Sequence, residues 1–193
     1  MKRVCVFCGS SNGARRAYPD AAKSLGRALA RRSIGLVYGG GNIGLMGAIA
    51  DIVIESGGEV IGVIPDALVG RELAHREVSE LLVVRSMHER KAKMAELSDA
   101  FIAMPGGFGT FEEFCEIITW AQLGLHRKPC GILNVEGYYD PLLTLFDQAV
   151  AEGFVYPENR RLVIQETDPD RLLDLLATYI PSRTEKWIDR DDS

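Results

Sequence analysis

Three glycines and a threonine precede two adjacent glutamates in the stretch PGGFGTFEE, residues 105–113. Glycines between a strand and a helix can aim backbone N–H groups at a phosphate, and the Thr110 hydroxyl adds a donor. No lysine precedes Thr110, so the stretch is not a Walker A loop and nucleoside triphosphate hydrolysis is disfavoured. The pattern predicts an anion site, with a purely structural turn as the alternative. Its expected donors are Gly106, Gly107, Gly109 and Thr110.

The two glutamates that follow, Glu112 and Glu113, would repel a phosphate. Acids in the first turn of a helix stabilise it through the helix dipole by about 0.3–1 kcal/mol each. One acid suffices for that effect, so the second is free for chemistry.

A second glycine-rich stretch, YGGGNIGLMG at 38–47, matches G-x-G-x-x-G through Gly39, Gly41 and Gly44. A dinucleotide site also needs an acid at the end of the next strand, where it can bind the ribose. The candidate, Glu59, stands at the start of that strand instead. The stretch therefore disfavours NAD(P) binding, and a tight turn that allows close helix–sheet packing is the alternative.

Arg90 lies on an apolar helix face in SMHERKAKMAELS, between Met87, Met94 and Leu97. Such an arginine either extends its charged end to water or pairs with an acid, or it holds a guanidinium at a cleft wall. At a cleft wall the guanidinium would face an anionic ligand, and the adjacent Lys91 would add positive charge.

The elements that must position these residues alternate between strands and helices. Short β-branched runs predict buried parallel strands at 3–8, 34–39, 59–65, 81–84, 99–105, 129–134 and 162–165. Helices are expected at 17–32, 43–56, 87–97, 110–124, 140–151 and 169–180. This order predicts a single doubly wound, Rossmann-like α/β domain over 1–181, with a parallel sheet, helices on both faces and ligands at the carboxyl ends of the strands. Residues 182–193 form a charged tail.

Composition narrows the class of protein. The 193 residues are 47% hydrophobic and 25% charged, and the net charge of −5 disfavours broad binding to nucleic acid or anionic membranes. The N-terminus carries too short an apolar run for a signal peptide, and no run approaches the length of a membrane helix, so we expect a cytoplasmic protein. Cys5 and Cys8 form C-x-x-C inside a strand-like run, and we expect them to be buried structural thiols.

The predicted 110–124 helix is apolar on two sides. Phe111, Phe114, Ile117, Ile118 and Ala121 form a face that would pack on the sheet, while Trp120 and Leu123 lie opposite. An aromatic residue on an outer face indicates a partner surface. We expect a homodimer with this helix at or near the interface.

The stretch at 105–113 resembles PGGxGTxxE, a pattern of the Lonely Guy (LOG) family. The members of this family are cytokinin riboside 5′-monophosphate phosphoribohydrolases. The same family resemblance includes VCVFCGSS, YGGGNIGLMG, MHERK and ITWAQLGLHRKPCGILNVEGYYDPLL, and it extends to about residue 150. Many such proteins carry the label lysine decarboxylase. That activity would need a pyridoxal phosphate lysine in a much larger fold.

The resemblance implies hydrolysis of the N-glycosidic bond in N6-modified AMP, and often in AMP, without cofactor or metal. It places the catalytic residues at Arg90 and Glu113. Substrate contacts fall on Glu72, Lys91, Gly107, Phe108, Gly109, Thr110, Phe111, Glu112 and Thr119, beside Gly106 of the glycine loop. The Glu72 assignment rests on its spacing from MHERK. The alternative is a non-catalytic carrier or sensor of a nucleotide or of the molybdenum cofactor.

Overall fold

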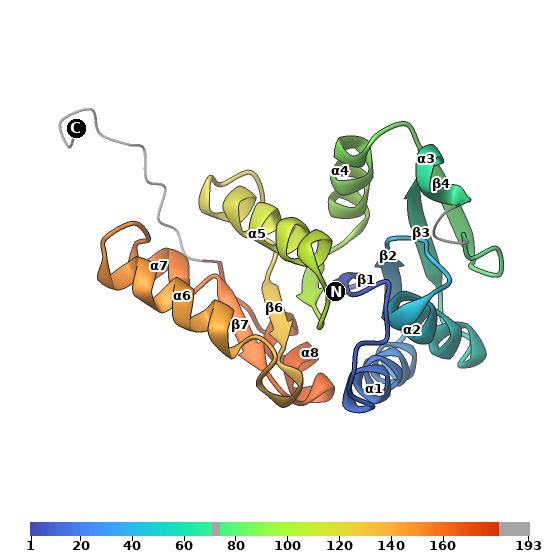
Figure 1. Cartoon of the computed structure of the whole chain (residues 1–193), viewed down its shortest axis with the longest axis horizontal. Coiled ribbons are helices and arrows are strands. Elements are labelled where there is room, and N and C mark those ends of the chain that lie inside the picture. Colours follow the sequence, from blue (N-terminus) through green and yellow to red (C-terminus); the bar gives the residue numbers. More distant parts are fainter. Residues whose placement is uncertain (71–73, 182–193) are drawn as a thin grey trace.

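One parallel sheet organises the protein, in a computed structural model that describes residues 1–70 and 74–181 (Figure 1). Its described strands follow the order β4-β3-β2-β1-β5-β6-β7. They are β1 (Arg3–Phe7), β2 (Gly35–Tyr38), β3 (Val60–Pro65), β4 (Glu80–Val84), β5 (Ala100–Ala103), β6 (Cys130–Leu133) and β7 (Val163–Glu166). Each lies at a predicted strand position, so the Rossmann-like α/β fold is confirmed.

The predicted helices also form. They are α1 (Ala17–Arg31), α2 (Gly44–Glu55), α4 (Met87–Leu97), α5 (Phe108–Gln122), α6 (Asp140–Ala151) and α8 (Pro169–Ala177). Sequence periodicity missed three short helical turns, α3 (Asp66–Val69), α7 (Pro157–Arg160) and the 3₁₀ helix η1 (Val135–Gly137). These turns are too short to display a helical repeat of apolar residues.

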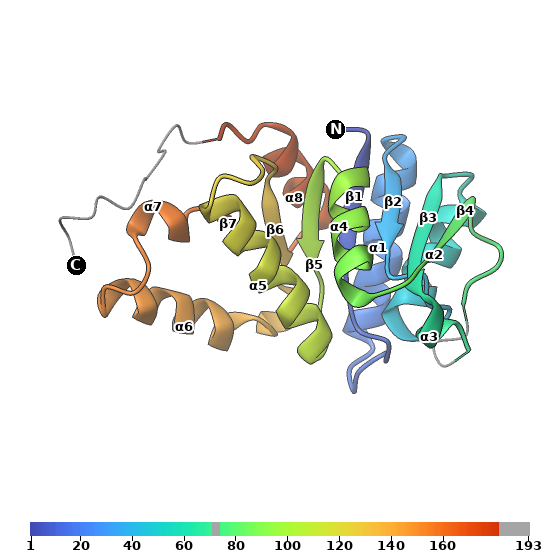
Figure 2. The same ribbon diagram turned by 90° about the horizontal axis from the view of Figure 1, so that it is seen from above.

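Two apolar layers cover the two faces of the sheet. In β1 the side chains alternate, so that Val4 and Val6 contact the layer of α1, α2 and α8, while Cys5 and Phe7 contact the layer of α4, α5 and α6. Figures 1 and 2 show α1 and α2 on one side of the strands and α4 and α5 on the other. Strands buried on both faces explain the continuous apolar runs of the sequence.

The strand order reverses beside β1. The chain runs outward from β1 through β2 and β3 to β4, and then returns to place β5 on the other side of β1. The loops meet there: the N–H of Met104 donates to the carbonyl of Phe7 (2.9 Å), that of Gly9 to Pro105 (3.0 Å), and that of Leu45 to Gly9 (3.0 Å). In open α/β sheets, ligands bind in the crevice at such a switch point.

The positions of Glu59 and of two cysteines test two further predictions. Glu59 lies at the amino end of β3, where its carboxylate accepts two 2.8 Å hydrogen bonds from Arg3, far from the ligand end of the sheet. Cys5 and Cys8 are buried in opposite apolar layers, and burial raises the pKa of each thiol. They are structural residues, as expected.

The apolar face of α5 is confirmed in its centre, because Phe114 and Ile117 are buried against the sheet. Trp120 differs from expectation: it packs partly buried against the same layer instead of standing on the outer face. Its large ring reaches around the helix to the core, a reach that helical spacing alone does not predict. Leu123 is exposed, as expected.

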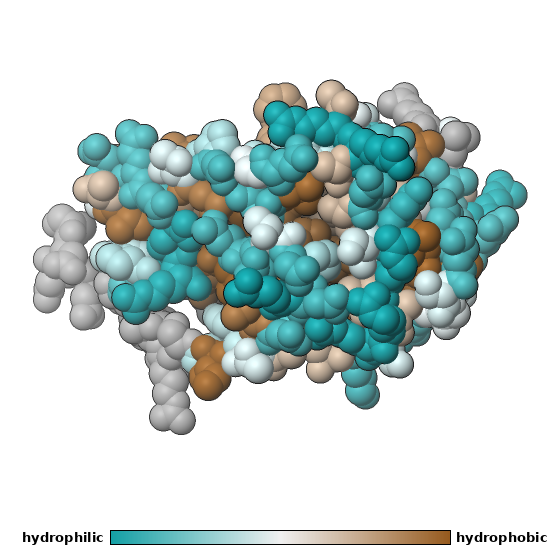
Figure 3. All heavy atoms as spheres, turned by 90° about the horizontal axis from the view of Figure 1, so that it is seen from below, coloured by the Kyte–Doolittle hydropathy of each residue, from teal (hydrophilic) through white to brown (hydrophobic). Residues whose placement is uncertain are grey.

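The surface is mixed. In Figure 3, hydrophilic residues cover most of the face seen from below, and hydrophobic residues show in separate patches between them. Among the helices of the described residues, none is long and apolar enough to cross a membrane.

The turn into α2 depends on a glycine. Gly44 has a φ of +63°, and a β-carbon there would lie 2.3 Å from the backbone carbon of Ser10. We expect Gly44→Ala to lower the free energy of unfolding by roughly 2–4 kcal/mol in urea denaturation. Gly57→Ala is the matched control, because Gly57 has a φ of +74° but open space around it; it should cost only about 1–2 kcal/mol. Equal losses would contradict a constraint from Ser10.

Candidate active site

A cavity of about 330 Å³ opens at the carboxyl ends of β1, β2 and β5, beside the switch point. This volume falls in the range of small-molecule sites. It is lined by Val6, Phe7, Cys8, Gly9, Ser10, Gly39, Met46, Leu68, Met87, Arg90, Met94, Gly107, Phe108, Gly109, Thr110, Glu112 and Glu113. Both predicted catalytic residues and most of the glycine loop therefore share one pocket.

Arg90 reaches this pocket from the second turn of α4. A side-chain N-cap starts the helix: the Ser86 hydroxyl accepts from the N–H of Glu89 (3.1 Å). The Glu89 carboxylate accepts from the N–H of Arg85, the residue before the cap (2.8 Å). This cap fixes where α4 starts, and with it which face of the helix carries Arg90.

Arg90 is only 6% exposed, and backbone carbonyls hold its guanidinium. Its Nε donates to the carbonyl of Val63 (3.1 Å) and its Nη2 to that of Gly39 (3.2 Å). Its Nη1 lies 3.8 Å from Oε1 of Glu113, which is 9% exposed. The carbonyls fix the cation, and its remaining edge faces the acid across the pocket.

Gly39 makes room for that guanidinium. A β-carbon at Gly39 would lie 2.0 Å from Nη2 of Arg90. Any larger residue would displace the cation or the turn. The first glycine of the G-x-G-x-x-G stretch therefore makes room for an arginine of the same chain, a role that sequence reasoning missed.

The second glycine loop differs from expectation in where its helix begins. α5 starts at Phe108, so that Phe108, Gly109 and Thr110 form its first turn, whereas the predicted helix began at residue 110. Glycine is tolerated at a helix start, because a helix interior is where its flexibility costs most. Among the described residues no side chain caps this end. The first N–H groups of α5 thus face the pocket with the positive end of the helix dipole.

Gly107 and Gly109 show a further property. A β-carbon at either position would meet no atom within 4 Å, and neither has a positive φ. Neither packing nor backbone strain requires glycine there. The absence of side chains leaves open space beside the N–H groups, which lets a ligand approach the backbone closely.

Gly106 differs from Gly107 and Gly109, because close packing at this position requires glycine; its predicted role as a phosphate donor stays a prediction. A β-carbon at Gly106 would lie 2.2 Å from Oγ1 of Thr110, which is buried. The Tyr138 hydroxyl donates to the carbonyl of Gly106, and the Tyr139 hydroxyl donates to that of Met104 (2.7 Å). Gly106 lines a neighbouring cavity of about 300 Å³ with Ser10, Ser11, Tyr138 and other residues.

Lys91 turns away from the pocket toward α5. Its Nζ donates to the carboxylate of Glu112 and to Oε1 of Glu116 (3.0 Å), and the residue is 9% exposed. Burial lowers the pKa of Lys91, but the two carboxylates outweigh it and raise that pKa above its ordinary value. Neighbouring residues of α4 therefore serve different acids of α5: Arg90 faces Glu113, and Lys91 binds Glu112 and Glu116.

Two other predicted contacts, Phe111 and Thr119, lie outside the described lining of the pocket. Phe111 packs against the rings of Tyr138 and Tyr139. The Thr119 hydroxyl donates to the carbonyl of Cys115 (2.8 Å), and Thr119 lines a separate cavity of about 170 Å³. Glu72 lies outside the described residues. Their roles as substrate contacts stay predictions.

Sequence reasoning missed the contribution of the loop after β1. Gly9 and Ser10 line the pocket, together with Met46 of α2. The signal was present, because small polar residues directly follow a central strand, and parallel strands end at the same edge of the sheet. Within the described ranges, no group of three or more His, Cys, Asp or Glu residues is arranged to hold a metal ion.

The protein is a Rossmann-like α/β protein with a ligand site. Its sheet is parallel and doubly wound, the pocket lies at the switch point, and an uncapped helix N-terminus faces that pocket. Solved structures agree on the fold. A molybdenum cofactor binding protein from Rippkaea orientalis superposes with a TM-score of 0.70 at 21% identity, over 92% of this chain and 97% of that chain. The molybdenum cofactor carrier protein from Chlamydomonas reinhardtii gives 0.69 at 21% identity, over 93% and 99%.

Sequence comparison identifies the family. The model of a family described as "Possible lysine decarboxylase" matches residues 46–176. A probable cytokinin riboside 5′-monophosphate phosphoribohydrolase of Oryza sativa subsp. japonica is 56% identical over 181 residues, 94% of this chain and 80% of that protein. A cytokinin riboside 5′-monophosphate phosphoribohydrolase of Arabidopsis thaliana is 55% identical over 94% of this chain and 85% of that protein. The chain belongs to the Lonely Guy family of cytokinin riboside 5′-monophosphate phosphoribohydrolases.

The Lys91 ion pairs can be tested against a neighbour on the same helix. Lys91→Met leaves two carboxylates without their shared cation in a partly buried setting, so we expect a loss of about 1–3 kcal/mol in the free energy of unfolding. Lys93→Met is the matched control, because Lys93 pairs with Glu96 in water; it should cost no more than about 0.5 kcal/mol. Urea denaturation measures both, and similar values would contradict a structural role for Lys91.

Proposed function

We propose that this protein hydrolyses the N-glycosidic bond of N6-modified adenosine 5′-monophosphates, and of AMP, to free base and ribose 5-phosphate. The observation that carries the proposal is the buried pair of Arg90 and Glu113, which face each other at 3.8 Å in a pocket beside the N-terminus of α5. The activity for which the relatives are named, at 55–56% identity over 94% of this chain, agrees with it.

The 5′-phosphate would bind at the start of α5. The backbone N–H groups of Phe108, Gly109 and Thr110 belong to the first helical turn and have no partner within the helix. The helix dipole favours an anion there. Open space at Gly107 and Gly109 allows a phosphate to approach the backbone directly.

Glu113 would act on the sugar. Cleavage of a glycosidic bond passes through an oxocarbenium-like state, in which positive charge grows on the ribose ring. Glu113 lies about one helical turn beyond the phosphate donors, so its carboxylate is placed to stabilise that charge and to orient the attacking water. Water adds its oxygen to C1′, the C1′–N9 bond breaks, and the electron pair of that bond leaves with the purine, which takes up a proton.

Arg90 would act as a fixed positive charge. A guanidinium does not give up a proton at neutral pH, because its pKa exceeds about 12. Its hydrogen bonds to the carbonyls of Val63 and Gly39 hold it in place before substrate arrives. It therefore stabilises developing negative charge, or the bound nucleotide, without reorganisation.

Lysine decarboxylation, the activity in the description of the matching family, is a poor fit to this pocket. A pyridoxal phosphate enzyme needs a lysine amine free to form a Schiff base. No lysine lines the pocket among the described residues, and the adjacent Lys91 is bound to Glu112 and Glu116.

The rival function is a non-catalytic carrier of a nucleotide or of the molybdenum cofactor on the same fold. Incubation with AMP and with isopentenyl-AMP, followed by chromatography of the free base, distinguishes the two. Release of many equivalents of base per protein supports the hydrolase. Stoichiometric binding without release would overturn it in favour of a carrier.

We further propose that the protein works as a homodimer with α5 near the interface. Leu123 and Leu125, which follow the centre of α5, are 65% and 70% exposed, and Phe154, after α6, is 86% exposed. Exposed apolar side chains of this size favour burial against a partner. A dimer would also account for Thr119, which lies outside its own chain's pocket. Sedimentation equilibrium tests this, and a monomeric mass would contradict it.

The four cysteines are all free thiols, and this supports the proposal of a cytosolic protein. Disulfides persist mainly in oxidising compartments. Detection of the protein in a secreted fraction would contradict the assignment.

Glu113→Gln should separate binding from chemistry. The variant keeps the size and hydrogen-bonding capacity of the side chain but lacks the negative charge, so kcat should fall about 10²–10³-fold while AMP still binds. Glu116→Gln, one turn further along α5 and outside the pocket lining, is the control and should keep near-normal kcat. Near-normal turnover in Glu113→Gln would remove Glu113 from the mechanism.

Gly39→Ala should resemble loss of Arg90 itself. The added methyl group would occupy the position of Nη2, so the guanidinium must leave its carbonyl acceptors. We expect kcat/KM to fall about 10²-fold, because displacement of a catalytic group by about 1 Å has effects of that size. Arg90→Ala, which should lose both turnover and affinity, is the reference. Unchanged kinetics in Gly39→Ala would show that Arg90 need not sit against Gly39.

A further inference from the structure

A short segment before β4 lies against the glycine turn that holds Arg90. Ala74 and Gly41 form an antiparallel bridge, and the N–H of His75 donates to the carbonyl of Gly40 (3.0 Å). The turn residues Gly39, Gly40 and Gly41 have no side chains with which to anchor themselves. Among the described residues, these backbone contacts are what fixes the turn on this side.

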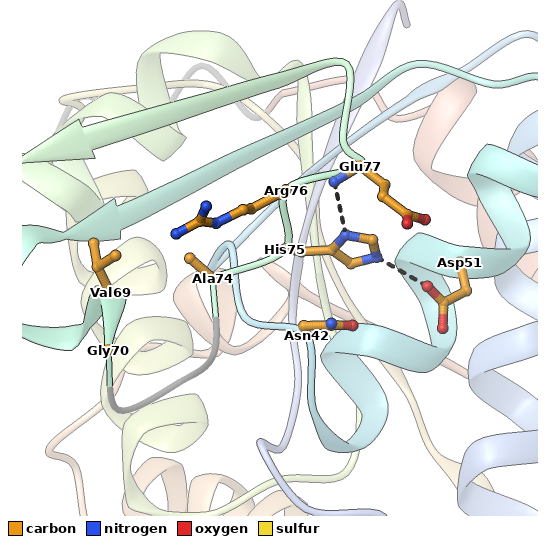
Figure 4. A pocket seen from close by; sticks show the side chains of 8 residues that line it. All are labelled: Asn42, Asp51, Val69, Gly70, Ala74, His75, Arg76 and Glu77. Carbon is orange, nitrogen blue, oxygen red and sulfur yellow. Dashed lines mark hydrogen bonds and ion pairs between the residues drawn. The ribbon is translucent and has the colours of Figure 1, made fainter.

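The side chain of His75 anchors that segment in turn (Figure 4). Its ring is 2% exposed and uses both nitrogens: Nδ1 accepts from the N–H of Glu77 (3.4 Å), and Nε2 lies 2.9 Å from Oδ1 of Asp51 on α2. Because Nδ1 accepts, the neutral ring must carry its proton on Nε2 and donate it to Asp51. His75 thereby ties the segment to α2 as well as to the glycine turn.

His75 does not touch the candidate pocket. It lines a separate cavity of about 660 Å³ with Asp51 and Asn42, and the described lining of that cavity shares no residue with the pocket of Arg90. Any effect of His75 on catalysis must therefore pass through other residues. The path is short: the carbonyl of Gly40 accepts from His75, and the preceding carbonyl, that of Gly39, accepts from Nη2 of Arg90.

We infer that His75 is a positioning residue for the reaction: with Asp51 it holds the Gly39–Gly41 turn so that the Gly39 carbonyl meets the guanidinium of Arg90. The inference rests on the proposed function, in which Arg90 acts on the nucleotide. It assigns a role to the G-x-G-x-x-G stretch and to a buried histidine that the mechanism itself does not use.

Kinetics of AMP hydrolysis in two variants test the inference. His75→Phe keeps the ring but loses both hydrogen bonds, so kcat should fall about 10–10²-fold through displacement of Arg90. His75→Gln keeps a donor for Asp51 and should recover most of that loss. Arg76→Ala and Glu77→Ala are matched controls, because both side chains are exposed and line the same cavity; kcat should stay within about twofold of the parent.

Asp51→Ala tests the same inference in case His75→Phe does not fold. The Asp51 side chain is 52% exposed, so its truncation leaves no cavity in the core, and the protein should stay folded with its melting temperature lowered only by the loss of one hydrogen bond. We expect kcat to fall roughly fivefold, the equivalent of one hydrogen bond. Unchanged kcat in a folded Asp51→Ala protein, or parent-like kcat in His75→Phe, would overturn the inference.

A double-mutant cycle identifies the route of the effect. If His75 acts through Arg90, His75→Phe should change kcat/KM by no more than about twofold in an Arg90→Lys background. Additive losses would overturn the inference while leaving the proposed function intact. If the parent protein releases no base, the proposed function fails by itself. The same cycle is then read in AMP affinity, where additive losses would again overturn the role of His75.

Discussion

The rest of the site depends on a buried positive charge. Removing a guanidinium from water costs several kcal/mol unless its hydrogen bonds are replaced. Arg90 obtains them from the carbonyls of Val63, within β3, and of Gly39, directly after the neighbouring strand β2. Those carbonyls have no charge to neutralise the cation, so Glu113 of α5 supplies the counter-charge at 3.8 Å. Strands β2 and β3, the glycine turn and the helices α4 and α5 therefore all lie around the Arg90 side chain.

The acids of α5 illustrate how charge is divided. Glu112, Glu113 and Glu116 lie close together on one helix, and their mutual repulsion would spread them apart. Lys91 binds Glu112 and Glu116, and this leaves Glu113 as the acid that faces Arg90. Two consecutive residues of α4 thus distinguish a structural pair of carboxylates from the one at the pocket. The helix-dipole role considered for Glu112 is wrong, because α5 begins at Phe108 and its first turn holds no acid. Glu112 is held by its ion pair with Lys91 instead.

Local patterns predicted the fold because the strands are buried on both faces. Runs such as VCVF in β1 and GLVY in β2 are typical of central strands of a covered sheet, so their positions follow from composition within the run. The same logic found Arg90, a charge on an apolar helix face. The same logic did not predict that Gly39 accommodates Arg90. Gly39 is 51 residues away along the chain, and only the fold brings it against the guanidinium. The partners of Lys91 and the role of His75 were hidden for the same reason. The early start of α5 was missed because glycines in a first helical turn resemble a loop.

The central position of β1 has a consequence for synthesis of the chain. β1 is made first, yet one of its two neighbours in the sheet, β5, begins at Ala100. When β4 has emerged from the ribosome, four of the seven described strands can pair, and β1 is then an edge strand with unpaired backbone groups. Arg90 is also made before its counter-charge, Glu113. The nascent protein therefore passes through a stage with an open apolar edge and an unneutralised cation at one place, which is where a chaperone or a wrong strand would bind.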